Sequence, residues 1–442
     1  MTSPVVLLSV PGLRPDDLQH MGNLEAVVGK GERTPLVPSF PCVTWPVQSN
    51  MVCGSQPKDH GVVANGFFWR DTHQVEMWTA WNDKIQQPQV WDILEKRGKR
   101  CAVWFPMLSK GCGAQNVCMP APVHNPDGSE SLWCYTKPEN FYGELLEEHG
   151  HFPLQNFWGP QTSIASSRWI VDSAIAAAKR FKPDFFYIYI PHLDYAAQRS
   201  GPDSEQAKIA LVELDNLLGK LFETMPGVMG KEVVWMVASE YAIVPVNHVS
   251  YPNRILREAG FLEVYQKEGE WIDFRNSQAW ALVDHQFAHV YIKPSATDKN
   301  VEEIAKLFRG SPGIAEVLVE QEREKYQLHH PRSGEIVLIS EPQSWQAYYY
   351  WKDDTQAPPF ARTVDIHRKP GYDPVELFFD PVAKSIPLDA TLVKGSHGAP
   401  ATAPFQQGIF ANSHAGLLEQ SNLHDGAIHD YNVYQLILDQ FQ

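Results

Sequence analysis

The sequence predicts an α/β protein with a doubly wound, mostly parallel central sheet flanked by helices, and with an inserted α+β lobe. Continuous apolar runs recur along the chain, each with the length of a strand that is buried on both faces. Helical patterns precede the later runs, and this alternation of strand and helix favours a parallel sheet. The runs comprise residues 5–10, 102–105, 185–190 and 233–238.

The clearest helical pattern begins near Asp203, which we expect to be the N-cap, with Gln206 three residues further on. Apolar residues then recur at helical spacing along one face, which is typical of a surface helix packed on a sheet. They are Ala207, Ala210, Leu211, Leu214, Leu217, Leu218 and Leu221.

The pattern changes between residues 253 and 386, where the elements become shorter and turns are more frequent. We therefore expect a first part of the core over residues 1–252, an inserted lobe or cap over 253–386, and a C-terminal part of the core over 387–442. Within the lobe the predicted elements are helices over 254–259 and 301–308 and strands over 288–292 and 335–339.

The composition is that of an ordered globular protein, and its charge limits the partners. The chain has 442 residues, of which 43% are hydrophobic, and a formal net charge of −15 at pH 7. Such an acidic chain lacks the basic surface that binding to a nucleic-acid polymer requires. A small phosphorylated substrate needs only local cations or metal ions. Composition leaves open whether the protein is a monomer or a homo-oligomer.

The cysteines and the N-terminal segment both favour a cytoplasmic protein. No Cys-X-X-Cys pair occurs, and a chain of this size needs no disulfides to fold, so we expect free thiols. The apolar run at residues 5–10 is too short for a secretory signal or a membrane span. We therefore expect a cytoplasmic location and no membrane contact.

Polar side chains follow the predicted strands, which is where open α/β sheets bind their ligands. Asp194 and Gln198 come after the run at 185–190. Glu240 comes after a later run, and His397 precedes a short apolar segment. Carboxylate and imidazole groups in such places suit a divalent metal site. Taken singly, each is more often a helix cap or a hydrogen-bonded structural residue.

Thr44 is the candidate nucleophile. It lies in a tight turn between Pro41 and Pro46, and prolines restrict the backbone, so its hydroxyl can be held in a fixed place. The apolar segment that follows predicts the start of a buried helix. Taken alone, such a turn is more often structural than catalytic.

Asp365 and His367 of the lobe stand two positions apart, so on an extended segment both side chains point the same way. This spacing suits a metal or phosphate site and suits a surface salt bridge equally well. Asp284, His285 and His289 form another polar cluster in the lobe.

A series of short motifs runs through the chain in a recognisable order. They are SVPGLRPD at 9–16, FPCVTWPVQSNMVCG at 40–54, DHGVVAN at 59–65, LDY at 193–195, GPD at 201–203, ELD at 213–215, NRILREAG at 253–260 and GSHG at 395–398. In this order they resemble the nucleotide pyrophosphatase/phosphodiesterase branch of the alkaline phosphatase superfamily. The resemblance covers nearly the whole chain and implies an alkaline-phosphatase-like fold.

The resemblance implies a metal-dependent hydrolase of phosphate esters, whether phosphodiesters, pyrophosphates or phosphomonoesters. In that family two divalent metals, usually zinc, flank the nucleophile, and an asparagine of the following loop holds a phosphoryl oxygen. Matched residue by residue, Thr44 takes the place of the nucleophile and Asn65 that of the asparagine. One metal lowers the pKa of the hydroxyl, and the other stabilises the leaving oxygen.

The metal ligands depart from the family pattern. Pro11 stands where the family has an aspartate, and Gln198 where it has a histidine. Ser239-Glu240-Tyr241 stands where it has an aspartate-histidine pair. Only Asp194 and His397 match unchanged, with Glu240 as a carboxylate substitute.

Three arrangements are compatible with these departures: a site rebuilt with ligands from the lobe, a site with a single metal, and a phosphate- or nucleotide-binding pseudoenzyme. Cleavage of phosphonate or sulfate esters is a further alternative, because it shares the same core. On the first arrangement the ion is zinc or manganese, and the ligands are Asp194, Gln198, Glu240, Asp365, His367 and His397.

Overall fold

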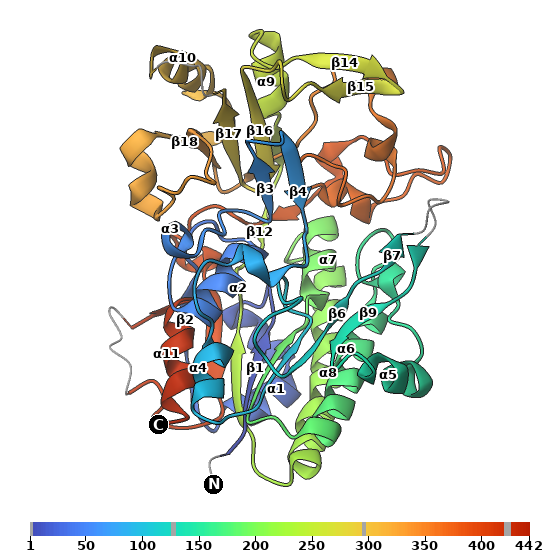
Figure 1. Cartoon of the computed structure of the whole chain (residues 1–442), viewed down its shortest axis with the longest axis vertical. Helices are drawn as coiled ribbons and strands as arrows, with labels where there is room; N and C mark the ends of the chain where they lie inside the picture. Colours follow the sequence, from blue (N-terminus) through green and yellow to red (C-terminus); the bar gives the residue numbers. More distant parts are fainter. Residues whose placement is uncertain (1–2, 125–129, 294–297, 420–425) are drawn as a thin grey trace.

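The computed structural model describes residues 3–124, 130–293, 298–419 and 426–442. A core is built on one large sheet, and a lobe sits beyond one end of the core strands (Figure 1). The N- and C-terminal ends lie together at the opposite end of the core.

The predicted α/β sheet is confirmed. At its centre lies β1 (Val5–Ser9), which pairs in parallel with β10 (Phe185–Tyr189) and with β11 (Val234–Ala238). The strand order is β23-β2-β22-β11-β1-β10-β5-β6-β9, and the antiparallel pairs lie toward the two edges. The other strands are β2 (Glu32–Val37), β5 (Cys101–Trp104), β6 (Asn116–Pro120), β9 (Cys134–Lys137), β22 (Gly408–Asn412) and β23 (Ile428–His429).

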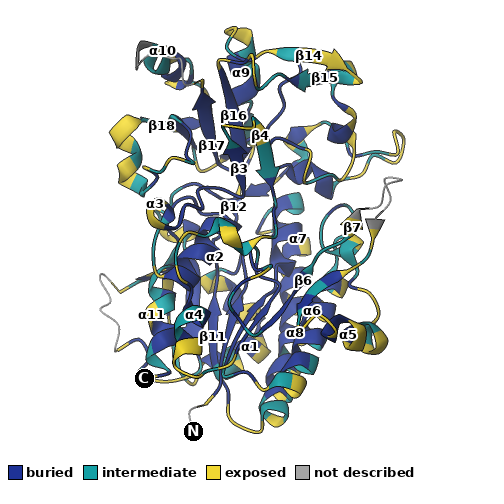
Figure 2. Cartoon of the chain, in the orientation of Figure 1, coloured by how far each residue is buried: buried dark blue, intermediate teal, exposed yellow. Residues whose placement is uncertain are grey.

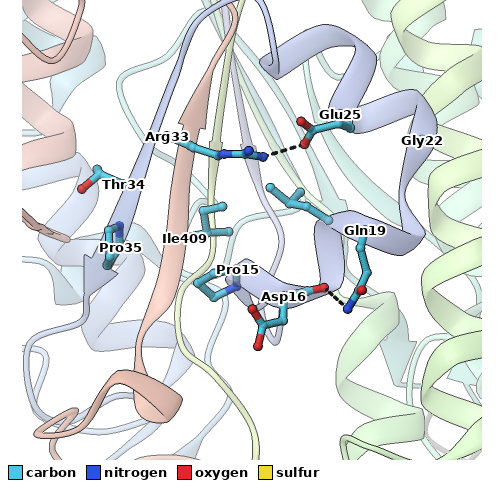
Figure 3. Close-up of a pocket in the computed structure, with 10 residues that line it drawn as sticks. Pro15, Asp16, Gln19, Gly22, Glu25, Arg33, Thr34, Pro35 and Ile409 are labelled. Atoms are coloured by element: carbon cyan, nitrogen blue, oxygen red, sulfur yellow. Dashed lines mark hydrogen bonds and ion pairs between the residues drawn. The ribbon is translucent and has the colours of Figure 1, made fainter.

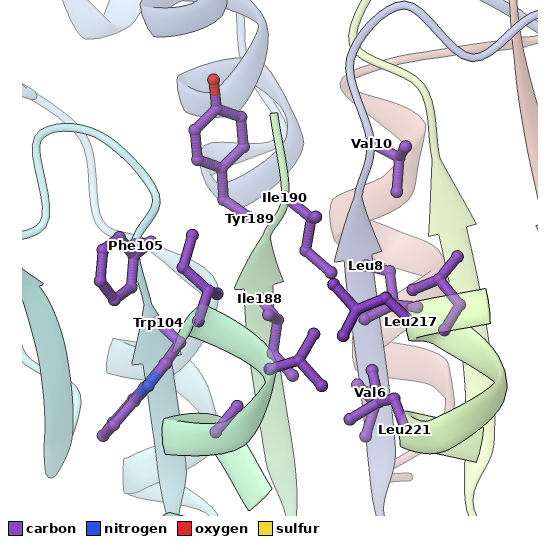
Figure 4. Packing of buried hydrophobic residues seen from close by; sticks show 14 of the residues in the cluster. Val6, Leu8, Val10, Trp104, Phe105, Ile188, Tyr189, Ile190, Leu217 and Leu221 are labelled. Carbon is purple, nitrogen blue, oxygen red and sulfur yellow. The ribbon is translucent and has the colours of Figure 1, made fainter. Parts of the chain in front are cut away.

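Strand β1 is apolar up to its last residue, Ser9, because helices cover both faces of the sheet. Val6 and Leu8 pack in one cluster with Leu217 and Leu221 of α8 (Glu205–Met229), as Figure 4 shows. The intervening residues of β1 pack in a second cluster on the other face. Successive side chains of a strand point to opposite faces, so both sets must be apolar. The other covering helices include α6 (Ile164–Phe181) on the first face and α2 (Thr44–Cys53), α4 (Val90–Lys96) and α11 (Asn432–Asp439) on the second.

The prediction that Asp203 caps α8 is wrong by one residue. The N-cap is Ser204, whose hydroxyl accepts a hydrogen bond of 3.1 Å from the backbone N–H of Ala207. Asp203 instead pairs with Arg14 at 2.7 Å. A serine immediately before the first helical residue satisfies a free helix N–H as well as aspartate does, which leaves the carboxylate for the ion pair.

The lobe contains a four-stranded antiparallel sheet in the order β16-β17-β19-β18. Its apolar cluster also takes in Phe68 and Met77, which belong to a hairpin far earlier in the chain. The division of the chain at residues 253 and 386 stays a prediction. The elements of the lobe region are α9 (Pro252–Glu258), β16 (Ala279–Asp284), β17 (Phe287–Ile292), α10 (Asp298–Phe308), β18 (Ile314–Val319), β19 (Ile336–Ser340) and the hairpin β3 (Gly66–Trp69) and β4 (Gln74–Met77).

All six cysteines are free, as predicted, and all six are buried. Among the residues that the structure describes, no helix is both long enough and apolar enough to cross a membrane.

Candidate active site

The carboxyl ends of the central strands lie side by side, because Ser9 of β1 pairs with Tyr189 of β10 and with Ala238 of β11. The buried helix predicted here is present as α2, but Thr44 is its first residue and Pro46 lies in its first turn, so Thr44 is not in a turn ahead of the helix as predicted. In Figure 2 the region where the core meets the lobe has the colour of buried residues. The residues of the predicted centre are buried there, namely Thr44, Asn65, Asp194, Gln198, Glu240 and His397.

A chain of hydrogen bonds joins Thr44 to Asp194 through Tyr241. The hydroxyl oxygens of Thr44 and Tyr241 lie 3.1 Å apart, and the Tyr241 hydroxyl donates to Asp194 Oδ2 at 3.0 Å. A phenol has one proton, so Tyr241 accepts from Thr44 while it donates to Asp194. Burial raises the pKa of Asp194 to about 7, and the bond from Tyr241 opposes this shift.

Asn65 anchors the start of α2 from the following loop. Its Oδ1 accepts from the backbone N–H of Trp45 at 2.9 Å. Its own backbone N–H donates to Asp284 Oδ2 at 2.7 Å, and its Nδ2 donates to Asp284 Oδ1 at 3.2 Å. Asp284 ends β16, so the lobe fixes the asparagine that adjoins Thr44. The side chain of Asn65 is therefore held close to the candidate nucleophile.

Glu240 is bound by two neutral donors. Its Oε1 accepts from Ser9 Oγ at 2.5 Å and from Gln48 Nε2 at 2.7 Å, while its Oε2 has no hydrogen-bond partner among the described residues. Gln48 is itself oriented by the backbone N–H of Met107, which donates to Gln48 Oε1 at 2.7 Å. Burial raises the pKa of Glu240 to about 8, because the ionised carboxylate has lost its water.

Four aromatic rings form a column across the junction between core and lobe. Tyr241 stacks on His397 with ring centroids 3.5 Å apart, His397 contacts His285 at 4.0 Å, and His285 stacks on Tyr372 at 3.5 Å. The Tyr372 hydroxyl donates to Gln198 Oε1 at 2.5 Å. The first two rings come from the core, and the other two come from the lobe.

Both imidazoles of the column are neutral, because burial lowers the pKa of His285 and of His397 well below the usual value. Nδ1 of His397 lies 2.8 Å from the carbonyl oxygen of Cys42, which can only accept, so this nitrogen carries the proton. Nδ1 of His285 lies 2.6 Å from Asp284 Oδ1.

The structure gives Asp365 and His367 local partners at the edge of the lobe. Asp365 forms an ion pair with Arg368, and its backbone N–H donates to Glu376 at 2.9 Å. Nδ1 of His367 lies 3.1 Å from the carbonyl oxygen of Met77. Arg368 lies three residues after Asp365 in the same turn, which brings the two charges together.

The donor set does not fit two divalent metals. Within residues 3–124, 130–293, 298–419 and 426–442, no three side chains of His, Cys, Asp or Glu come together as a group that could hold a metal ion. Pro11 has no donor atom in its side chain, Gln198 Oε1 already accepts from a phenol, and the Tyr241 hydroxyl is a donor to Asp194. Structural and catalytic zinc sites need three or four protein ligands.

Several residues of this centre were not assigned a role from the sequence. Tyr372 and His285 come from the lobe, and nothing in the local sequence indicates that they reach the strand ends of the core. The position of Gln48 could have been noticed, because it is a polar residue one turn after Thr44 and so lies on the same face of the predicted helix. Ser9 could have been noticed in the same way, because it is a polar residue at the end of an otherwise apolar strand.

A separate cavity of about 650 Å³ lies against α1 (Gly22–Val28) and β2 on the core (Figure 3). Its one described ion pair joins Arg33 to Glu25 at 2.8 Å. The cavity contains none of the residues around Thr44, and its one arginine is paired with Glu25, which leaves Asp16 as an additional negative charge. It therefore adds no chemistry to the candidate site.

Comparison with solved structures supports the fold. A phosphonoacetate hydrolase from Sinorhizobium meliloti, solved with phosphonoacetate, superposes with a TM-score of 0.66 at 16% identity, over 100% of this chain and 96% of the other. Murine ectonucleotide pyrophosphatase/phosphodiesterase 5, solved as an inactive form with AMP, superposes with a TM-score of 0.63 at 14% identity. The match covers 99% of this chain and 95% of the other.

Sequence comparison finds curated relatives that are longer proteins. An uncharacterized pyrophosphatase/phosphodiesterase of Schizosaccharomyces pombe is 25% identical over 225 residues, which are 50% of this chain and 40% of the relative. Ectonucleotide pyrophosphatase/phosphodiesterase family member 3 of Mus musculus is 24% identical over 229 residues, 50% of this chain and 22% of the relative. The chain thus spans less than half the length of these relatives. The model of the type I phosphodiesterase / nucleotide pyrophosphatase family matches residues 5–373, and the chain belongs to this family.

Proposed function

We propose that this chain cleaves phosphate esters of small molecules, with Thr44 as the nucleophile that attacks phosphorus. The observation that carries the proposal is the hydrogen-bond chain from the Thr44 hydroxyl through Tyr241 to Asp194. A weakly acidic hydroxyl needs a base within hydrogen-bond reach to attack, and the base needs a third group to orient it. Membership of the family supports the same reaction class.

The proposed first step transfers one proton along this chain. As Thr44 Oγ1 forms its bond to phosphorus, its proton passes to the Tyr241 oxygen, and the Tyr241 proton passes to Asp194 Oδ2. The bond from phosphorus to the leaving oxygen breaks, and its electron pair departs with that oxygen. Leaving groups that are stable anions, such as the phosphate of a pyrophosphate bond, suit this step. Water then attacks the phosphothreonine: the bond from phosphorus to Thr44 Oγ1 breaks, and Asp194 returns its proton through Tyr241 to that oxygen. The phosphate leaves with the oxygen and the protons of the water.

Asn65 supplies a donor for the phosphoryl group in this proposal. Its Nδ2 carries two protons, and the described bond to Asp284 uses one of them. The other can donate to a phosphoryl oxygen held next to Thr44. Because the remaining atoms of Asn65 are bound to Trp45 and Asp284, the donor is positioned before the substrate arrives.

The burial of Thr44 requires the lobe to move before a substrate can bind. The residue is only 4% exposed, and rings of His285 and Tyr372 from the lobe cover the neighbouring part of the core. We propose that the lobe opens to admit substrate and closes to exclude water from the reacting atoms. AMP, with which murine family member 5 was solved, indicates the size of ligand to test first.

A second candidate function is phosphate or nucleotide binding without turnover. The neutrality of the centre favours it: both imidazoles are neutral, and the raised pKa of Asp194 and of Glu240 leaves few fixed charges to stabilise a transition state.

The metal dependence implied by the resemblance remains a prediction. The steps above are written without metal because the donor set does not fit two ions.

The test is a panel of phosphodiester, pyrophosphate, phosphomonoester and phosphonate substrates with the natural chain, Thr44→Ala and Thr44→Ser. We expect Thr44→Ala to lower kcat/KM by about 10³-fold or more, while Thr44→Ser, which keeps a hydroxyl, retains turnover. Unaltered turnover by Thr44→Ala removes Thr44 from the mechanism. Binding of AMP to the natural chain without turnover of any substrate favours the second candidate.

A further inference from the structure

Two residues of one helix face each accept a hydrogen bond from a buried phenol. Asp194 and Gln198 lie one turn apart on α7 (His192–Ser200). Asp194 Oδ2 accepts from Tyr241 at 3.0 Å, and Gln198 Oε1 accepts from Tyr372 at 2.5 Å. Both helix residues are buried, at 7% and 1% exposure, so these acceptors would otherwise be left without a partner.

The two phenols are fixed at the two ends of the ring column. Tyr241 lies parallel to His397, with 5° between the ring planes, and Tyr372 lies within 15° of His285. Rings packed at 3.5 Å cannot move apart to admit a cation without breaking the stack and both hydroxyl bonds. One oxygen of each helix residue is therefore already bonded to a phenol, while Asp194 Oδ1 has no hydrogen-bond partner among the described residues.

We infer that this centre has no resident divalent metal, and that the hydroxyls of Tyr241 and Tyr372 occupy the positions beside Asp194 and Gln198 where metal ions would otherwise bind. The inference rests on the proposed function, since it concerns how the Thr44 site operates. Its test measures bound metal and does not require turnover, so failure of the inference and failure of the proposed function are separate results.

The experiment measures zinc and manganese in the purified full chain after dialysis, by elemental analysis and by calorimetric titration. We expect no stoichiometric metal and no saturable binding at this site up to about 100 µM, because a site needs at least three deprotonated ligands to hold zinc tightly. A variant with Pro11→Asp, Gln198→His and Tyr241→His restores donor atoms at three positions. We expect it to gain at least one tightly bound zinc ion.

A matched variant, Asp194→Asn with His397→Gln, shows where any zinc is bound. The inference is overturned if the natural chain binds stoichiometric zinc and this variant loses it, with the affinity for zinc reduced about 10-fold or more. Zinc that the variant retains with unchanged affinity is bound elsewhere, and the inference stands. The measurements on the natural chain decide the question even if the zinc-restoring variant fails to fold. If Thr44→Ala keeps full activity in a metal-free chain, the proposed nucleophile is wrong while the inference holds.

Discussion

The Thr44 hydroxyl lies 3.1 Å from the Tyr241 hydroxyl, which in turn donates to a buried carboxylate. This contact joins the first residue of α2 to the residues that follow β11, at the point where the central strands end. Because Tyr241 donates its only proton to Asp194, its oxygen is free to accept the proton of Thr44. The phenol is therefore positioned to relay a proton from the proposed nucleophile to Asp194, the proposed base.

Replacing Tyr241 with phenylalanine removes the relay and keeps the ring. We expect Tyr241→Phe to lower kcat about 10²-fold or more with a smaller change in KM, because a positioned proton acceptor typically contributes that much. Steady-state kinetics on the best substrate of the panel measures both constants. Tyr349→Phe is the matched control, since Tyr349 lies in the lobe and its buried hydroxyl has no hydrogen-bond partner among the described residues. A Tyr241→Phe variant with unchanged kcat contradicts the relay.

Glu240 makes stability fall as the pH rises. Burial raises its pKa from 4.5 to about 8 in the folded chain, so the folded state holds a proton that the unfolded state releases. The stabilisation that comes from this proton is complete below the pKa of Glu240 in the unfolded chain. It is lost as the pH increases through the pKa of Glu240 in the folded chain. Glu240→Gln removes this titration and keeps an oxygen for Ser9 and Gln48.

We therefore expect the melting temperature of Glu240→Gln to decline less than that of the natural chain between about pH 5 and about pH 8. Thermal unfolding across this range measures the difference. The buried carboxyl of Asp194 remains in both proteins and adds a slope of the same sign. Equal declines in the two proteins would show that Glu240 ionises freely in the folded state.

A buried lysine bridges two carboxylates within the lobe. Lys369 Nζ lies 2.8 Å from Asp373 and 2.6 Å from Glu376, and all three residues are at most 4% exposed. Lys369→Met leaves two buried acids without a cation, which we expect to lower the free energy of unfolding by about 3–5 kcal/mol. Denaturant titration measures this change. Arg368→Met, which breaks a largely exposed ion pair next to it, is the control with little expected effect.

The sequence was sufficient for the sheet, because a strand covered by helices on both faces has to be apolar along its covered length, as β1 is from Val5 to Leu8. Local capping was less certain: Asp203 and Ser204 are both good N-caps, and only the ion pair of Asp203 with Arg14 shows which one the chain uses. Neighbouring positions of this kind cannot be separated by pattern alone.

The candidate site was predictable only where its residues follow the strands. Asp194 and Glu240 come directly after β10 and β11, so topology brings them near Thr44. Tyr372 and His285 reach the same place from the lobe through contacts between distant parts of the chain, and no spacing in the sequence encodes such contacts. Their ring stacking is visible only in three dimensions.

The most direct test of the account is to trap the covalent intermediate. The natural chain is mixed with its best substrate, quenched in acid within the first turnover, and digested, and the peptide that contains Thr44 is analysed by mass spectrometry. The account predicts one added phosphoryl group on Thr44 in the natural chain, and none on this peptide in Thr44→Ala. Turnover by the natural chain without any phosphorylated Thr44 under these conditions, or a phosphoryl group on another residue, would contradict it.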